Sequence, residues 1–426
     1  MRLTGAGPHP GVRSKKNCRA AGRILAYFSD HSLVLLSQYS RYYSPMPAIH
    51  SAAIIGPVVW GSVWGHGPEL ARFLAGRVSV DYYDPLVPAE AAAPSFKAAG
   101  AYPEIDGVRV VRRRSRRKLG LLYGLEMEWK NLRAACHSNA DCLVTYYPLG
   151  SVLALLWCRA KRKRSLFVFA DQPEILGSRL ARFLARRIFL RLTARLASAG
   201  CLATSHLLYE EISKLSPSAL LVPNGVDLKN LPQVSGPAEK YERFSAGFVG
   251  FFGEWVDFEL LFRAAGLCPE IEFRIIGDGP RRAELQKKAQ GLANVIFTGP
   301  LPHEEVFRRI AGMQVCLIPF KVNALTDRVS PVKLFEYWAM GKPVLATGCY
   351  ELRQTARSAP GEALSLVGNA EDLAAGLRAL RDNPGRLQEA STMAREAVRE
   401  YDWEKLGRRI AQFIEGEAAS ARIKSN

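Results

Sequence analysis

Short apolar runs alternate with amphipathic stretches along the chain from Met46 onward. In the first unit, AAIIGPVVWGS (Ala52 to Ser62) predicts a buried strand, and PELARFLAG predicts a helix that opens at Pro68 and closes at Gly76. The glycine-rich WGHG between them predicts a tight loop. Strand, loop and helix in this order are typical of a parallel sheet covered by helices.

The same alternation occurs in both halves of the chain, which predicts two α/β domains. In the first half we expect further strands at VSVDYYDP, DCLVTYYP, SLFVFADQP and AGCLATS. In the second half we expect six strands, at residues 246–252, 272–279, 294–301, 315–320, 342–348 and 363–368. Intervening stretches such as HEEVFRRIAGM predict helices on both faces of a doubly wound parallel sheet.

The length of 426 residues agrees with two Rossmann-like domains that face each other across a cleft. We expect these domains at residues 46–223 and 245–400, with a connection at 224–244. Residues 1–45 lack the alternation and are expected to be a disordered extension or a mis-assigned start. Residues 401–426 should form a helix that packs back towards the first domain, and then a tail. Because ligands of doubly wound sheets bind at the carboxyl ends of the strands, the function should reside in the cleft.

Composition narrows the class of protein. Apolar residues make up 48% and charged residues 23% of the chain, near the averages for globular proteins. The eight cysteines form no C-x-x-C pair, which favours reduced thiols in a cytosolic compartment and no structural metal. No apolar run approaches the roughly 18 to 20 residues that a spanning helix needs.

The positive charge, a formal net +18, is concentrated in the first half of the chain. Two dense basic runs, RRRSRRK from Arg112 and RAKRKR from Arg159, would suit an anionic membrane, a lipid pyrophosphate or nucleic acid. Alternatively they are a solvated loop and a helix end. We expect Arg112, Arg113 and Arg114 to hold the chain at an anionic leaflet by peripheral, salt-sensitive contact.

The segment from Ile318 to Gly348 carries the most specific signal. After a strand and a polar loop, the Ser-Pro pair at Ser330 predicts a helix start with serine as the N-cap. Free N–H groups at that helix end, together with Lys333 in the first turn, would suit a pyrophosphate. Glu336, three residues further on, shares the helix face and could accept hydrogen bonds from ribose hydroxyls. Alternatively, these two side chains form an exposed ion pair.

This segment resembles a known family. PVKLFEYWAMGKPVLAT is similar to the donor-binding motif of GT-B glycosyltransferases of the group 1 type. The longer KVNALTDRVSPVKLFEYWAMGKPVLAT resembles a bacterial surface-polysaccharide subset related to teichuronic acid biosynthesis enzymes. FVGFFGEWVDFELL, IIGDGP and VPNGVD are similar to the same group, so the resemblance covers nearly the whole C-terminal half. It is weaker over residues 58–205.

The resemblance implies the GT-B fold and sugar transfer from a nucleotide diphosphate donor, without a cofactor, in the synthesis of a cell-surface polysaccharide. The implied acceptor is a glycan or a polyprenyl-pyrophosphate-linked sugar at the cytoplasmic face of the membrane. It also implies roles for particular residues of the donor site and the hinge. Glycines admit the phosphates, Lys333 holds the pyrophosphate, Glu336 holds the ribose, and a loop contacts the nucleobase. The glycines at the phosphates are Gly250 and Gly253. Gly277 and the loop at residues 300–302 lie against the base, and Asn224 and Gly225 form the hinge.

The chain departs from the group eight positions before Glu336, where retaining members carry a second glutamate and this sequence has Arg328. Because arginine binds phosphate bidentately, Arg328 could neutralise the departing diphosphate without a metal ion. Retention or inversion is left open. An inverting reaction would need a general base, and Asp171 directly after the strand SLFVFA is the first candidate. Alternatively Asp171 caps a turn, and His66 in the glycine loop is the second candidate for acceptor contact or proton transfer.

Two other functions remain as alternatives. A GT-B-shaped nucleotide-sugar epimerase would use the same donor site without an acceptor. A basic nucleic-acid-binding protein would account for the charge, but no RNA- or DNA-binding module is recognisable, so we expect no nucleic-acid partner.

Overall fold

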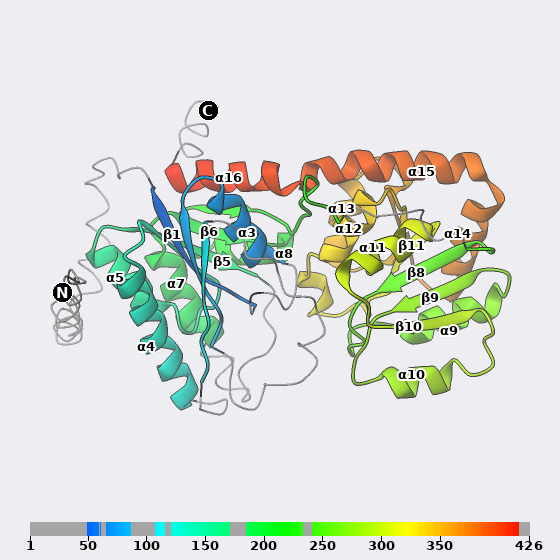
Figure 1. Ribbon diagram of the computed structural model, residues 1–426, viewed down its shortest axis with the longest axis horizontal. Helices are drawn as coiled ribbons and strands as arrows, with labels where there is room; N and C mark the ends of the chain where they lie inside the picture. Colours follow the sequence, from blue (N-terminus) through cyan, green and yellow to red (C-terminus); the bar gives the residue numbers. More distant parts are fainter. Residues whose placement is uncertain are drawn as a thin grey trace, which may run out of the picture.

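The structure, a computed structural model, describes residues 49–58, 60, 65–86, 107–115, 121–170, 185–232 and 241–416. Figure 1 shows two lobes, each built around a sheet, with helices running across the top from one lobe to the other. The expected extension at residues 1–45 lies outside the described residues, and so does the tail beyond residue 416.

The N-terminal sheet has seven parallel strands in the order β3-β2-β1-β4-β5-β6-β7. Chain connections reverse direction between β1 and β4, where Ala52 lies opposite Cys142. The strands are β1 (Ser51–Ile55), β2 (Ser79–Tyr83), β3 (Val108–Val111), β4 (Cys142–Thr145), β5 (Arg164–Phe169), β6 (Gly200–Ala203) and β7 (Ala219–Leu221).

Helices cover both faces of this sheet because successive strand residues point to opposite sides. Ile54 of β1 packs into a core with α3, whereas Ala53 packs into a core with α4 and α5. The helices of this domain are α3 (His66–Ala75), α4 (Leu121–Ser138), α5 (Val152–Ala160), α7 (Leu190–Leu196) with the preceding π-turn η5 (Ala185–Phe189), and α8 (His206–Ser213).

The C-terminal sheet has six parallel strands in the order β10-β9-β8-β11-β12-β13. All six strands predicted for this half are present, and the connections reverse between β8 and β11, where Ala246 lies opposite Val315. The strands are β8 (Ser245–Val249), β9 (Glu272–Ile276), β10 (Val295–Gly299), β11 (Val315–Ile318), β12 (Val344–Thr347) and β13 (Leu364–Val367).

Short helices follow these strands, as the amphipathic stretches predict. They are α9 (Phe258–Leu267), α10 (Arg282–Lys288), α11 (His303–Gly312), α12 (Val332–Ala339), α13 (Tyr350–Ser358), α14 (Ala370–Asp382) and α15 (Pro384–Ala397). Single 3-10 turns lie at η6 (Thr326–Arg328), η7 (Gly361–Ala363) and η8 (Val398–Tyr401). Two parallel α/β sheets of this kind confirm the predicted fold class.

Helix α16 (Trp403–Glu415) returns to the N-terminal domain and becomes part of its core. Trp403 and Ile410 are buried there, and Gly407 lies so close to α3 that a Cβ would come within 2.3 Å of the Phe73 ring. The chain therefore crosses between the domains twice. The two crossings are joined by backbone hydrogen bonds of 3.0 Å, from Val226 to Tyr401 and from Trp403 to Val226.

Candidate functional site

Two glycines lie at the carboxyl ends of neighbouring strands in the C-terminal sheet. Gly250 follows β8 and Gly277 follows β9, with φ values of 151° and 137° that side chains rarely adopt. A Cβ on Gly277 would lie 1.9 Å from the carbonyl oxygen of Gly250, and a Cβ on Gly250 would lie 2.5 Å from Nζ of Lys333. Glycine is therefore required at both positions if the two loops and the lysine are to approach this closely.

Lys333 lies in the first turn of α12, beneath the Gly250 loop. Its Nζ lies 4.5 Å from the centre of the Phe248 ring and 5.5 Å from that of the Phe320 ring. Burial lowers the pKa of this ammonium to about 8, while the nearby Glu336 opposes the shift. Among the described residues, the ammonium contacts aromatic rings rather than a carboxylate or a carbonyl. A buried cation in such a setting is stabilised when an anion binds beside it.

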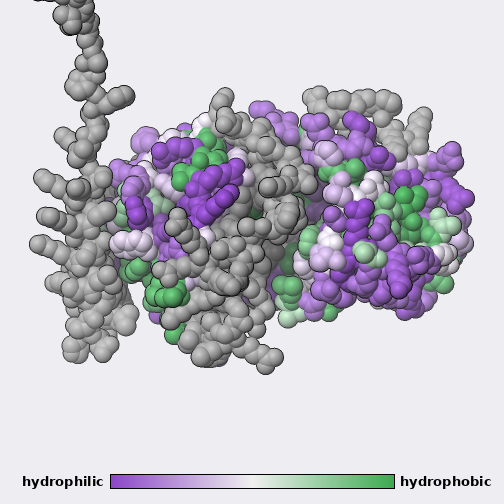
Figure 2. Space-filling model, turned by 60° about the horizontal axis from the view of Figure 1, so that its bottom comes forward, coloured by the Kyte–Doolittle hydropathy of each residue, from purple (hydrophilic) through white to green (hydrophobic). Residues whose placement is uncertain are grey.

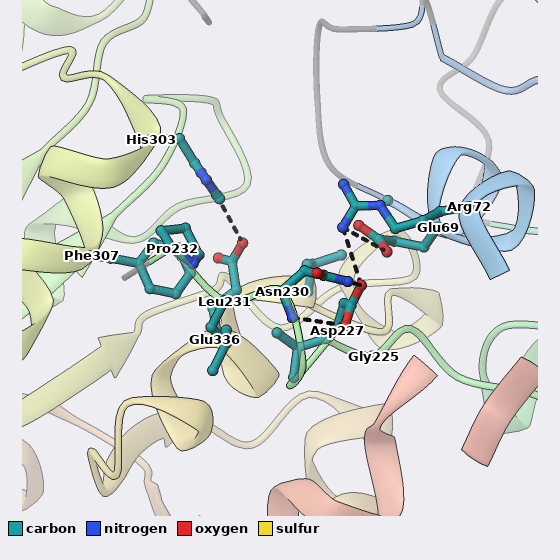
Figure 3. A pocket seen from close by; sticks show the side chains of 13 residues that line it. Glu69, Arg72, Gly225, Asp227, Asn230, Leu231, Pro232, His303, Phe307 and Glu336 are labelled. Atoms are coloured by element: carbon teal, nitrogen blue, oxygen red, sulfur yellow. Dashed lines mark hydrogen bonds and ion pairs between the residues drawn. The ribbon is translucent and has the colours of Figure 1, made fainter. Parts of the chain in front are cut away.

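One turn along α12, Glu336 lines a pocket between the domains (Figure 3). The pocket contains about 400 Å³ of empty space, counting its open mouth. Oε1 of Glu336 lies 3.9 Å from Nε2 of His303, which directly follows the loop at residues 300–302 expected to contact the nucleobase. Helix α12 thus places the cation for a phosphate and the carboxylate for a ribose one turn apart. Both roles remain predictions.

Helix α3 of the N-terminal domain contributes charged side chains to the same pocket. Nη1 of Arg72 lies 3.2 Å from Oδ2 of Asp227 and 3.8 Å from Oε2 of Glu69. Burial raises the pKa of Glu69 to about 7; Arg72 opposes this shift, while Asp227 and Glu336 add to it. Three carboxylates therefore share one pocket, which provides hydrogen-bond acceptors for the hydroxyl groups of a nucleoside or sugar.

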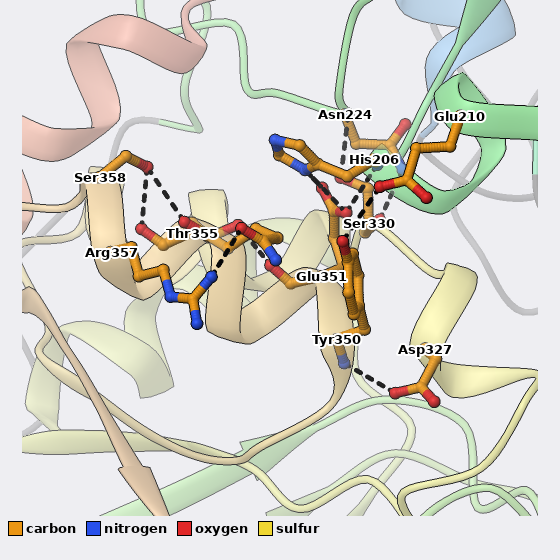
Figure 4. A network of polar contacts seen from close by, with 11 residues as sticks. His206, Glu210, Asn224, Asp327, Ser330, Tyr350, Glu351, Thr355, Arg357 and Ser358 are labelled. Atoms are coloured by element: carbon orange, nitrogen blue, oxygen red, sulfur yellow. Dashed lines mark hydrogen bonds and ion pairs between the residues drawn. The ribbon is translucent and has the colours of Figure 1, made fainter. Parts of the chain in front are cut away.

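Ser330 does not cap α12, contrary to the prediction from the sequence. The helix begins one residue later, with Pro331 at the N-cap and no side-chain cap. Instead, Oγ of Ser330 accepts a hydrogen bond of 3.1 Å from the backbone N–H of Asn224, and the Asn224 amide donates to the carbonyl of Ser330 at 2.6 Å. The predicted hinge residue is therefore bonded directly to the segment that leads into α12, as Figure 4 shows.

Arg328 is already paired in this arrangement of the domains. Its Nη1 lies 2.7 Å from Oε2 of Glu211, on helix α8 of the N-terminal domain. A predicted contact with the departing diphosphate would require Arg328 to leave Glu211. Arg328 thus forms an ion pair between the two domains in this structure.

Helix α8 also makes two contacts with α13 of the C-terminal domain (Figure 4). The buried carboxylate of Glu351 accepts from the backbone N–H of His206 at 2.9 Å and lies 3.1 Å from the His206 ring. The Tyr350 hydroxyl donates to Glu210 at 3.1 Å. The hydrogen bond to Glu351 raises the pKa of His206 above its ordinary value. We call this set of contacts, together with the Arg328 pair, the α8 latch.

His66 does not fit the role predicted for it. Its side chain is buried, Nδ1 lies 2.9 Å from the hydroxyl of Tyr146, and the ring packs edge-on against Trp403. Burial lowers the pKa of His66 to about 3, so the ring is neutral near pH 7 and enclosed in the domain core. The other candidate base, Asp171, lies outside the described residues.

The basic run at Arg112 is only partly available to a membrane. Arg112 donates to Asp84 and to the carbonyl of Trp60. Arg113 is partly buried and donates to the carbonyl of Asp84 and to Asn131 at 2.6 and 2.7 Å. These bonds hold the end of β3 in place, so the expectation that all three arginines face a leaflet is wrong for Arg113. Arg114 is exposed.

Sequence reasoning missed the charged residues of α3 and the latch. Glu69 and Arg72 are three residues apart on an amphipathic helix, a spacing typical of solvent-exposed pairs. Glu351 likewise lies in the first turn of a helix, where an acidic residue is common. Both sites are formed by contacts between segments that are far apart in the sequence, so no local pattern could have identified them.

The structure describes no helix long and apolar enough to cross a membrane. Nor do His, Cys, Asp and Glu side chains within the described ranges form a group of three or more able to hold a metal ion.

The latch should make the interface between the domains sensitive to pH. Because the folded-state pKa of His206 is raised, its stabilising contact is fully present below the ordinary value of 6.5 and is lost as pH rises through the folded value. We expect the thermal midpoint to fall over this window, and His206→Gln to flatten the fall. His137→Gln, at an exposed histidine of α4, is the control. Equal pH slopes for the His206 variant and the unmodified protein would contradict the latch.

Comparisons with known proteins concern the C-terminal domain and the fold. Residues 243–383 match the family model for group 1 glycosyl transferases. TuaH of Bacillus subtilis, described as a teichuronic acid biosynthesis glycosyltransferase, is 27% identical over 235 residues, which are 53% of this chain and 58% of TuaH. The chain thus spans little more than half the length of this curated relative.

Solved structures resemble almost the whole chain. Sucrose-phosphate synthase from Thermosynechococcus elongatus is 18% identical with a TM-score of 0.63, over 87% of this chain and 100% of that one. HepE from Anabaena, in complex with UDP-glucose, is 17% identical with a TM-score of 0.60, over 86% of this chain and 99% of that one. At these identities the likeness concerns the fold. The chain therefore has the GT-B fold, and its residues 243–383 match the family model for group 1 glycosyl transferases.

Proposed function

We propose that this chain is a glycosyltransferase that moves a sugar from a nucleotide diphosphate to a glycan or lipid-linked acceptor in the synthesis of a cell-surface polysaccharide. The observation that carries the proposal is the buried ammonium of Lys333, which lies beneath the Gly250 loop and, among the described residues, contacts aromatic rings rather than a carboxylate. The UDP-glucose complex of HepE and the description of TuaH support the donor class and the polysaccharide role.

In this proposal the chain's own residues bind and orient the donor. Lys333 and the free N–H groups at the start of α12 neutralise the diphosphate, which is the leaving group. Glu336 accepts hydrogen bonds from the ribose and fixes the nucleoside in the pocket. The α8 latch holds the acceptor domain over the sugar and excludes water. The acceptor hydroxyl, rather than water, then attacks the anomeric carbon.

The fate of the sugar tests this function. Radiolabelled UDP-, GDP- and dTDP-sugars are incubated with the chain, with and without an extract of bacterial membrane lipids. We expect label to move into the lipid or glycan fraction with one donor, and Lys333→Ala to lose this transfer. Label that remains on the nucleotide as a different sugar, whether or not lipid is added, would identify an epimerase instead.

Lys333 should bind the diphosphate as a cation. Lys333→Ala is expected to weaken binding of the nucleoside diphosphate by about 1.5 to 3 kcal/mol, the range for a hydrogen bond to a charged group. Because the pKa is about 8 in the free protein, affinity should fall as pH is raised from 7 to 9.5 in the unmodified protein and stay level in the variant. Titration calorimetry measures both effects, with Lys287→Ala on α10 as the control. Unchanged affinity in Lys333→Ala would refute the assignment.

Glu336 should recognise the ribose rather than the phosphates. Glu336→Gln keeps the size of the side chain but removes its charge, so we expect weaker binding of the nucleoside as well as of the diphosphate. The loss should disappear for 2′,3′-dideoxyribonucleotides, which lack the hydroxyl groups that Glu336 is proposed to bind. Glu284→Gln, at an exposed glutamate of α10, is the matched control. Equal losses with ribo- and dideoxyribonucleotides would count against this role.

A further inference from the structure

Helix α4 turns an apolar side towards solvent. Leu122, Leu125 and Trp129 follow one another at helical spacing, and their exposed fractions are 61%, 59% and 51%. The opposite side of the helix carries Tyr123 and Met127, which are buried. Since the outward side of a helix in a globular domain is normally polar, an apolar outward side indicates a contact with another surface.

The helical layer that contains α4 carries many exposed cations. Helix α5 packs against α4 and α7 packs against α5, so the three helices form one layer over the N-terminal sheet, and Ile188 of η5 adds an apolar side chain that is 49% exposed. Figure 2 shows green hydrophobic residues next to purple hydrophilic ones at the surface of this lobe. The exposed cations of the layer are Arg133, Arg159, Lys161, Arg162, Arg187, Arg191 and Arg195.

Carboxylates hardly offset this charge. Among the described residues of α4, α5, η5 and α7 the only carboxylates are Glu126 and Glu128. Glu126 lies 2.7 Å from Nζ of Lys130 and also accepts from Ser115, and Glu128 is buried and accepts from backbone N–H groups at the start of α5. The layer therefore presents apolar side chains within a strongly positive surface.

We propose that this surface binds an anionic phospholipid bilayer, with Leu122, Leu125 and Trp129 inserted at the level of the headgroups. We call it the α4 face: the three apolar residues, Ile188 and the seven exposed cations. Nucleic acid would also satisfy the cations, but it offers no apolar phase for exposed leucines. A bilayer satisfies both, and tryptophan favours its interface.

The inner side of α4 gives a reason for docking here. Tyr123, Met127 and Asn131 line a pocket at the carboxyl ends of the N-terminal strands, with about 290 Å³ of empty space counting its open mouth. Arg113 also lines it, and its Nη2 is buried without a hydrogen-bond partner in the described part of the chain. One helix thus separates a bilayer-binding surface from a guanidinium that suits the phosphate of a lipid-linked acceptor. Only this last step rests on the proposed function.

Vesicle cosedimentation tests the α4 face with the full chain and no nucleotide. The probes are vesicles of phosphatidylcholine alone and of phosphatidylcholine with phosphatidylglycerol at 3:1. We expect binding to the anionic vesicles, reduced about tenfold by Leu125→Ser and about fivefold for each of Arg191→Ser and Arg195→Ser. Leu267→Ser and Lys287→Ser, at exposed positions of the other domain, should change nothing. Circular dichroism is used to check that each variant is folded.

Quenching by lipids brominated on the acyl chain tests insertion itself. We expect these lipids to quench the fluorescence of the bound protein, and Trp129→Phe to remove most of the quenching while retaining binding. Binding without quenching, or no binding to anionic vesicles at 0.1 M salt, would overturn the proposal. So would tight duplex RNA binding that needs the arginines but tolerates Leu125→Ser. Donor binding, measured separately by calorimetry, distinguishes failure here from failure of the proposed function.

Discussion

The proposed donor site depends on a buried lysine ammonium that, among the described residues, contacts aromatic rings and no carboxylate. Desolvation disfavours the charged form of Lys333 and lowers its pKa to about 8, and the two aromatic rings beneath it compensate only in part. Such an arrangement costs stability in the free protein. In the proposed function a diphosphate replaces the lost water, so the free-energy cost of the buried charge is recovered as affinity for the donor.

That position in turn constrains the backbone around it. Gly250 and Gly277 have to lack side chains because the ends of β8 and β9 approach each other and the lysine within contact distance. Helix α12 follows β11 and the turn η6 next to the point where the sheet connections reverse, and Asn224 ties the start of this helix to the chain crossing between the domains. The chain crossing between the domains and the start of α12 are therefore linked directly through Asn224 and Ser330.

Local pattern explains how far the sequence alone could lead. The six C-terminal strands are short, apolar and separated by amphipathic helices, so their order along the chain was predictable. In the N-terminal domain β3 was missed because VRVV is only partly buried and runs directly into arginines, and β7 was missed because it has three residues. The family motif identified Lys333 and Glu336 as candidates because both lie within one short segment.

What the sequence could not show are contacts between distant segments. Arg328 and Glu211 are 117 residues apart, His206 and Glu351 are 145 apart, and Ser330 and Asn224 are 106 apart. Each residue also has a role that its local sequence would allow. Arg328 could bind phosphate, His206 could be the first residue of a helix, and Ser330 could cap one. Only the packing of the two domains decides between the local role and the distant one. The same holds for α4, whose leucines fit a buried helix as well as an exposed one.

A crystal structure of the chain with its nucleotide diphosphate sugar tests the central claim most directly. The account predicts that a diphosphate oxygen lies within hydrogen-bond distance of Nζ of Lys333, and that the ribose hydroxyls donate to Glu336 in the pocket between the domains. A nucleotide bound with its diphosphate away from Lys333, or with its ribose outside this pocket, would contradict it.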